Sequence, residues 1–121
     1  MVNVIKIDKK IKKPAPHDKR KAQEIINKSA EDSGNVIYTV HAKEQMAKRG
    51  FVFNDVLTIL RDGIIRQEPR YNEEKHSWAY RVEFQEFDGE RDAGCVVAIQ
   101  KKAKLHVVTI MWISDQGGYY D

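Results

Sequence analysis

The 121-residue sequence has few of the residues that cross-link a fold through disulfides or metal, and few long apolar stretches. Cys95 is the only cysteine, so no intramolecular disulfide can form and a zinc site built from several cysteines is excluded. No apolar run approaches the roughly 20 residues that a membrane-spanning helix needs. The amino-terminal order, apolar before basic, is wrong for a secretion signal. We therefore expect a protein of the reducing cytoplasm with no membrane partner.

Positive charge is concentrated at one end of the chain. Residues 1–21 carry eight Lys and Arg against two Asp, whereas the remainder carries 13 basic and 16 acidic residues. Pro14 and Pro16 oppose a regular helix in this basic stretch. We predict a basic arm over residues 1–17 and a single domain over residues 18–121. The arm fits either a polyanion-binding segment or a solvated, solubilising one.

The sequence predicts helices in the first half of the domain. Apolar residues recur at helical spacing over residues 18–31, from residue 39 to about 49, and over residues 54–63. Asp18, Thr39 and Asn54 are the expected N-caps of these three helices, and Gly50 and Gly63 are the expected ends of the last two.

The second half reads as strands. Residues 78–84 alternate between apolar and polar, residues 95–99 and 105–113 are β-rich, and residues 64–66 form a short run. Turn residues at 88–92 and 101–104 separate the longer strands. The sequence therefore predicts an α+β fold in which helices pack on an antiparallel sheet of about four strands.

One face of the second helix carries polar groups at helical spacing. His41, Gln45, Lys48 and Arg49 follow one another at intervals of four, three and one residues, so they share a stripe. Imidazole, amide, ammonium and guanidinium groups along one stripe suit an anionic ligand. A solvated surface face is the competing interpretation.

The same helix carries a resemblance to a known family. The sequence resembles a family of small bacterial toxins in one extended motif. The motif consists of His41-Ala42, six further residues, Arg49-Gly50, residues 51–56, and Gly63 to Ile65. That family is grouped loosely with the RelE, BrnT and MqsR messenger-RNA interferases, and the resemblance covers roughly residues 36–113. It implies a RelE-like fold, a toxin–antitoxin pair with a cognate antitoxin protein as partner, and endoribonuclease activity on mRNA, free or ribosome-bound, with no metal or other cofactor.

Such chemistry needs a base for the ribose 2′-hydroxyl, an acid for the leaving oxygen and cations for the phosphate. On the resemblance, His41, Arg49 and Arg81 become the candidate catalytic residues. Each has a structural alternative: a helix-start histidine bonded to backbone, an arginine that closes its helix, and an arginine paired with Glu83. The candidate substrate-binding residues are Lys48, Gln45, Arg70, Lys75, His76 and Tyr38.

The remaining histidines do not suggest a metal site. His17, His41, His76 and His106 lack the close spacing of paired metal ligands. We expect His106 to share a strand face with Val108, Ile110 and Trp112, as a histidine at the edge of the core. A non-enzymatic module on the same fold, which binds protein or nucleic acid, is the alternative function.

Overall fold

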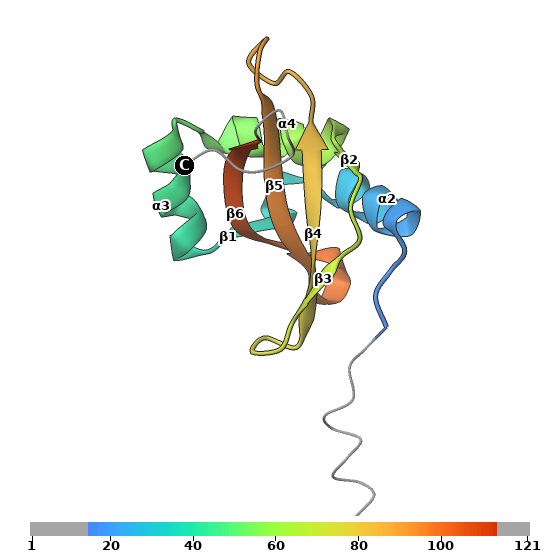
Figure 1. The fold of residues 1–121 in the computed structure, drawn as a ribbon. Helices are drawn as coiled ribbons and strands as arrows, with labels where there is room; N and C mark the ends of the chain where they lie inside the picture. Colours follow the sequence, from blue (N-terminus) through green and yellow to red (C-terminus); the bar gives the residue numbers. More distant parts are fainter. Residues whose placement is uncertain (1–14, 114–121) are drawn as a thin grey trace, which may run out of the picture.

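The computed structural model describes residues 15–113, which form three helices and a six-stranded sheet (Figure 1). Nearly all of the predicted basic arm therefore lies outside the described residues, and its role stays a prediction. The helices are α2 (Lys19–Ser29), α3 (Val40–Arg49) and α4 (Phe53–Asp62). The strands are β1 (Val36–Tyr38), β2 (Ile64–Ile65), β3 (Arg70–Asn72), β4 (Ser77–Phe84), β5 (Asp92–Ile99) and β6 (Leu105–Ile113).

The predicted α+β class is confirmed, but the sheet is larger and less uniform than expected. Its order is β1-β6-β5-β4-β2, with β3 also paired to β4, and the β1–β6 pair is parallel while the others are antiparallel. The two unexpected strands, β1 and β3, are three residues long. A segment of that length is too short to show an alternating pattern, so only its pairing partner reveals it as a strand.

Local capping explains where the helices start. The Asp18 carboxylate accepts from the Lys21 backbone N–H at 2.8 Å, and Thr39 Oγ1 accepts from the Ala42 N–H at 3.0 Å. The expected cap at Asn54 is wrong, because α4 already begins at Phe53. There the carboxylate of Asp55, the third residue of the helix, accepts from the backbone N–H of Val52 at 2.8 Å. This bond satisfies the N–H group of the residue that precedes the helix.

One face of the sheet is covered by α2 and α4, and α3 lies beside the β6 edge (Figure 1). The residues between the helices and the sheet are apolar and fully enclosed, and they form one core. This arrangement leaves the other face of the sheet free of helices. The largest fully buried core side chains include Ile26, Val56, Ile59, Leu60, Tyr80, Val82, Val97 and Ile110.

A β-bulge divides β6 into two parts of opposite phase. Val97 pairs with Val107, but the preceding residue Val96 pairs with Thr109, so Val108 is the extra residue. An extra residue switches every following side chain to the other face of the strand. The side chains before and after Val108 therefore cannot be assigned to faces by simple alternation.

The bulge corrects the expected position of His106. Ile110 and Trp112 are buried in the core beneath the helices. His106 pairs with Ala98 and is half-buried on the opposite, helix-free face. The expectation that His106 shares a face with Ile110 and Trp112 is wrong, because it assumed an uninterrupted strand.

Among residues 15–113, no helix is long and apolar enough to cross a bilayer.

Candidate functional site: a groove across the helix-free face

A row of small side chains makes a hollow in the helix-free face. Arg70 on β3 pairs with Ala79 on β4, Ala79 pairs with Ala98 on β5, and Ala98 pairs with His106 on β6. Neighbouring strands lie about 4.8 Å apart, so three spacings place the Arg70 and His106 backbones roughly 14 Å apart. The two alanines between them supply only methyl groups, which leaves a depression with an arginine at one end and a histidine at the other.

The His106 end of the hollow forms a cavity of about 270 Å³. His106 comes from β6, His41 from the first turn of α3, and Lys75 from the hairpin that joins β3 and β4. The structure thus brings two histidines and a lysine from three separate elements to one cavity. Its other lining residues are Thr39, Asn72, Ser77, Ala79, Ala98, Gln100 and Val108.

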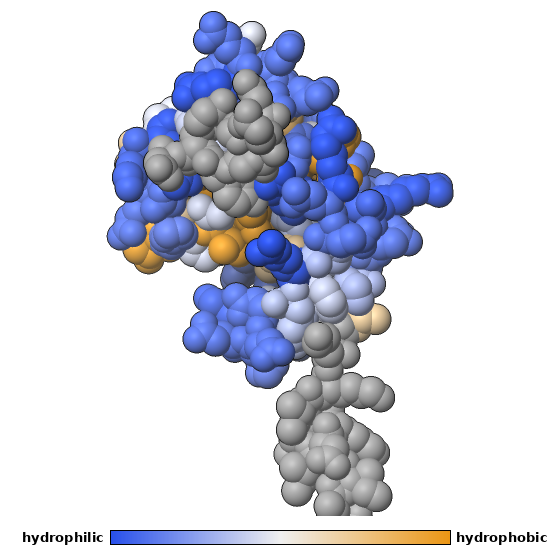
Figure 2. Space-filling model, viewed as in Figure 1, coloured by the Kyte–Doolittle hydropathy of each residue, from blue (hydrophilic) through white to orange (hydrophobic). Residues whose placement is uncertain are grey.

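The other end forms a second cavity of about 430 Å³ that contains Arg70 and Arg81. Ala79 lines both cavities, so they adjoin, and we call them together the groove. Figure 2 shows apolar surface at the centre of this face with polar side chains around it. The remaining lining residues of the second cavity are Gln67, Glu68, Val96, Thr109 and Met111.

Arg81 pairs with Glu83, which is the structural alternative that the sequence left open, and it also lines the groove. Its side chain lines the groove, and it also binds Glu83 on the same strand face, with Nε 2.7 Å and Nη2 2.6 Å from Glu83 Oε2. Arg66 Nε lies 3.5 Å from the other carboxylate oxygen. Glu83 thereby fixes the direction of the Arg81 guanidinium and offsets part of the positive charge at this end.

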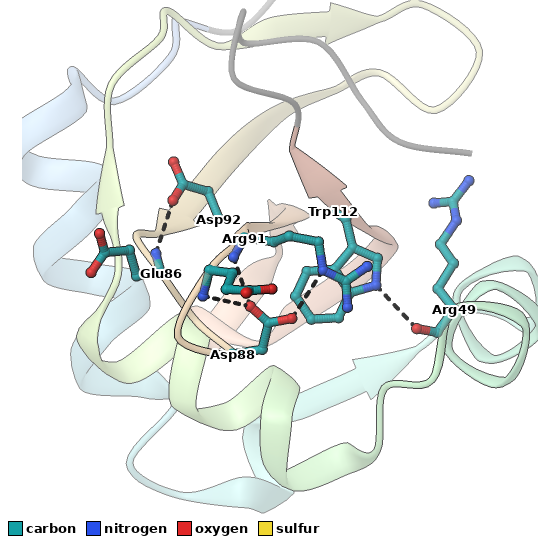
Figure 3. Close-up of polar contacts among 7 residues, drawn as sticks. Arg49, Glu86, Asp88, Arg91, Asp92 and Trp112 are labelled. Carbon is teal, nitrogen blue, oxygen red and sulfur yellow. Dashed lines mark hydrogen bonds and ion pairs between the residues drawn. The ribbon is translucent and has the colours of Figure 1, made fainter.

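Arg49 lies outside the groove. Its Nη1 donates to the Ile110 carbonyl at 2.7 Å, on the part of the β6 edge beyond β1. The Trp112 indole N–H donates to the Arg49 carbonyl at 3.1 Å (Figure 3). Arg49 therefore joins α3 to β6. Gln45, one turn earlier, is half-buried, and its Oε1 has no hydrogen-bond partner within residues 15–113.

The β4–β5 loop reaches the same tryptophan. The Arg91 guanidinium carbon lies 3.8 Å from the centre of the Trp112 ring, and Arg91 Nε donates to Asp88 at 2.9 Å (Figure 3). The backbone N–H groups of Arg91 and Glu90 also donate to Asp88 and hold the pKa of its carboxyl down at about 2. Asp92 Oδ1 also accepts from the Glu86 N–H at 2.8 Å, so two carboxylates order this loop (Figure 3).

The other predicted substrate-binding residues are dispersed. Lys48 is exposed on α3, and His76 is exposed on the β3–β4 hairpin with a φ of +50°. Tyr38 pairs with Val107 on the core face, and its ring lies 4.7 Å from that of Phe53. Burial raises the pKa of Tyr38 to about 12. The groove therefore gathers four predicted residues, His41, Lys75, Arg70 and Arg81, and not Gln45, Lys48, Arg49, His76 or Tyr38.

His106 is the groove residue that sequence reasoning missed. It follows the three-lysine turn and precedes a β-branched run, and nothing in that run marks where the bulge falls. The groove holds acid–base and phosphate-binding groups in one place. Within residues 15–113, no set of three or more His, Cys, Asp or Glu side chains is placed to hold a metal ion.

The groove residues lie within a stretch of the chain that matches a known family. Residues 38–112 match the model of a family described as a domain of unknown function, DUF4258. The chain belongs to the DUF4258 family. The match contains both groove histidines and both groove arginines, whereas α2 precedes it. No curated protein and no solved structure matches this DUF4258 chain.

Proposed function

We propose that this DUF4258 protein is a metal-independent endoribonuclease that cleaves mRNA and acts as the toxin of a toxin–antitoxin pair. The observation that carries the proposal is the meeting of His41, His106 and Lys75 in one cavity that adjoins Arg70 and Arg81. The resemblance of the helix motif to the RelE, BrnT and MqsR toxins supports the same reaction class. A cognate antitoxin would be the protein partner, and the cytoplasm the site of action.

The two histidines suit the proton transfers of RNA cleavage. One neutral imidazole takes the proton of the ribose 2′-hydroxyl as that oxygen attacks the adjacent phosphorus. The other, as imidazolium, gives a proton to the 5′-oxygen as the bond from phosphorus to that oxygen breaks. The products are a 2′,3′-cyclic phosphate and a 5′-hydroxyl, so atoms and charge balance with no metal or co-reactant. Imidazole serves both roles because its ordinary pKa lies near neutrality.

The cations of the groove suit the phosphate. Charge builds up on the non-bridging oxygens as the phosphorus becomes five-coordinate, and fixed donors stabilise it. Lys75 shares the cavity of the histidines, and we assign it to the reacting phosphate. Arg70 and Arg81 line the adjoining cavity, and we assign them to a neighbouring phosphate of the same strand.

The test is induced expression of wild type beside His41→Ala and His106→Ala, with growth and the 5′-ends of cleaved mRNA as readouts. Loss of either histidine removes one proton-transfer group, which should lower cleavage about 100-fold or more. His17→Ala is the matched control, because His17 is exposed and its hydrogen bonds within residues 15–113 come from its backbone: its N–H donates to the Tyr80 hydroxyl at 2.9 Å, and its carbonyl accepts from that hydroxyl at 3.4 Å. Normal growth and intact mRNA on induction of wild type would sink the proposal.

The pH dependence of cleavage gives a second, independent check. A base that must be neutral and an acid that must be protonated produce a bell-shaped rate profile. Each single histidine variant should lose the limb that its own imidazole contributes. A wild-type profile that is flat between pH 5 and 8 would contradict a histidine pair.

One feature of the groove favours the alternative, a non-enzymatic binding module. Glu83 is paired with Arg81, and Glu68 lines the same cavity, so this end is less cationic than its arginines alone imply. A module of that kind would bind RNA or a protein in the groove and leave RNA intact. Retained RNA binding with no cleavage by wild-type protein would favour it.

A further inference from the structure

The histidine end of the groove has a lining suited to more than a phosphate. Its ionisable residues are His41, Lys75 and His106, and none of its described lining residues is a carboxylate. The floor between them is the methyl surface of Ala79 and Ala98. A cavity of about 270 Å³ lies below the volumes typical of drug-sized ligands and suits a single ring system.

The amide of Asn72 is held in a defined orientation at this end. The Lys75 backbone N–H donates to Asn72 Oδ1 at 3.0 Å, and a backbone N–H can only donate. The oxygen end of the amide therefore faces the hairpin, and the NH₂ group is the end that remains. Asn72 is an exposed residue of the cavity lining, and within the described part of the chain its Nδ2 has no hydrogen-bond partner, so this NH₂ group is available as a donor to a bound molecule.

We propose that this end of the groove seats one nucleobase of the RNA substrate with its 4-position towards Asn72, and that Asn72 selects a base with a carbonyl oxygen at that position. Uracil carries an acceptor, O4, where cytosine carries a donor amine, N4. Against the Asn72 donor, uracil forms a hydrogen bond, whereas cytosine leaves two donors facing each other. The inference rests on RNA being the substrate of the groove, and it adds base preference to the proposed function.

The test is binding of full-length protein to fluorescent 2′-O-methyl uridine and cytidine decamers. These probes lack the attacking hydroxyl, so they report recognition without cleavage, and they differ only in the base. Wild type should bind the uridine probe about tenfold more tightly, since one good contact to a base edge discriminates by about 1–3 kcal/mol.

Asn72→Asp is the decisive variant. It keeps an oxygen for the Lys75 N–H and replaces the NH₂ group by an acceptor of the same shape, so the preference should reverse to cytidine. Asn54→Asp, which makes the same charge change at an exposed position at the start of α4, should leave the uridine preference unchanged. Circular dichroism checks that both variants fold.

The possible outcomes separate the base-binding proposal from the catalytic proposal. Equal wild-type affinity for the two probes, or an unchanged preference in Asn72→Asp, overturns the proposed base-binding site even if mRNA is cleaved. If Asn72→Asp reverses the preference but wild type does not cleave unmodified RNA, the base-binding site is supported and the catalytic proposal is wrong. Absence of binding to either probe overturns the proposed base-binding site, and the cleavage assay then decides the catalytic proposal separately.

Discussion

Arg81 and Glu83 lie two residues apart on β4 and form an ion pair in which each side chain is only 9% exposed. The pair sits on the helix-free face at one end of the groove. A guanidinium so far removed from water depends on its carboxylate, because an unpaired charge at such a site costs several kcal/mol. The same contact that points Arg81 along the groove is therefore part of the stability of the sheet.

Removal of the carboxylate alone should be costly. We expect Glu83→Ala to lower the free energy of unfolding by about 3 kcal/mol, measured by urea denaturation. The double variant Glu83→Met with Arg81→Met, which removes both charges and keeps side-chain volume, should recover most of that loss. Equal stability of the single and double variants would show that the loss in Glu83→Ala does not come from leaving the Arg81 charge without this carboxylate.

Arg49 should act on stability and not on chemistry. Arg49→Met loses the bond to the Ile110 carbonyl, and a hydrogen bond from a charged donor contributes about 2 kcal/mol. Lys48→Met, an exposed neighbour, is the matched control and should change the unfolding free energy by less than about 0.5 kcal/mol. RNA cleavage per folded molecule should stay unchanged in both. Loss of cleavage in Arg49→Met at full stability would instead place Arg49 on the substrate.

A larger side chain on the groove floor should block the site without unfolding the domain. Ala79 lines both cavities from the middle of the face, so Ala79→Leu projects into the groove and not into the core. We expect at least a tenfold loss of RNA binding, measured by anisotropy, with an unfolding free energy within about 1 kcal/mol of wild type. Ala47→Leu, an exposed position on α3, is the control. Full RNA binding by Ala79→Leu would show that RNA does not enter the groove.

The β4–β5 loop should carry an acid-sensitive contribution to stability. The pKa of Asp88 is about 2 in the folded protein, below its ordinary value of 3.8, because backbone and side-chain donors of Arg91 and the N–H of Glu90 stabilise the carboxylate. A lowered folded pKa gives stability that is present above about pH 4 and lost as pH falls towards 2. Asp88→Asn should therefore be less stable than wild type at pH 6, and the difference should shrink at pH 2.5. A constant difference across that range would contradict the linkage.

Local signals predicted most of the secondary structure. Asp18, Thr39 and Gly50 mark helix ends through interactions within one turn, so their effect is visible in the sequence and recurs in the structure. The cap of α4 was misplaced because Asp55 reaches back from inside the helix and makes a side-chain cap at Asn54 unnecessary. Strands β1 and β3 were missed because three residues are too few to show an alternating pattern. The partner of β1 is also distant in the sequence, whereas β3 pairs with β4 across a short polar hairpin.

The candidate site was predicted in part. His41 and Arg81 were singled out from a helix stripe and a strand position, and both line the groove. Arg49 belongs to the same stripe, yet its side chain turns to the β6 edge, because an unpaired carbonyl there offers it a strong acceptor. The stripe alone cannot separate residues that face a ligand from residues that face another strand.

The sequence by itself determined the α+β class, the N-caps of α2 and α3 and a set of basic residues, because these depend on spacing and on contacts between near neighbours. Only the tertiary structure decided that Arg70 and His106 stand at opposite ends of one groove. Their relation depends on three strand pairings and on a bulge at Val108 that reverses the phase of β6. Register and bulges are set by packing across the whole sheet, so no local pattern in the chain records them.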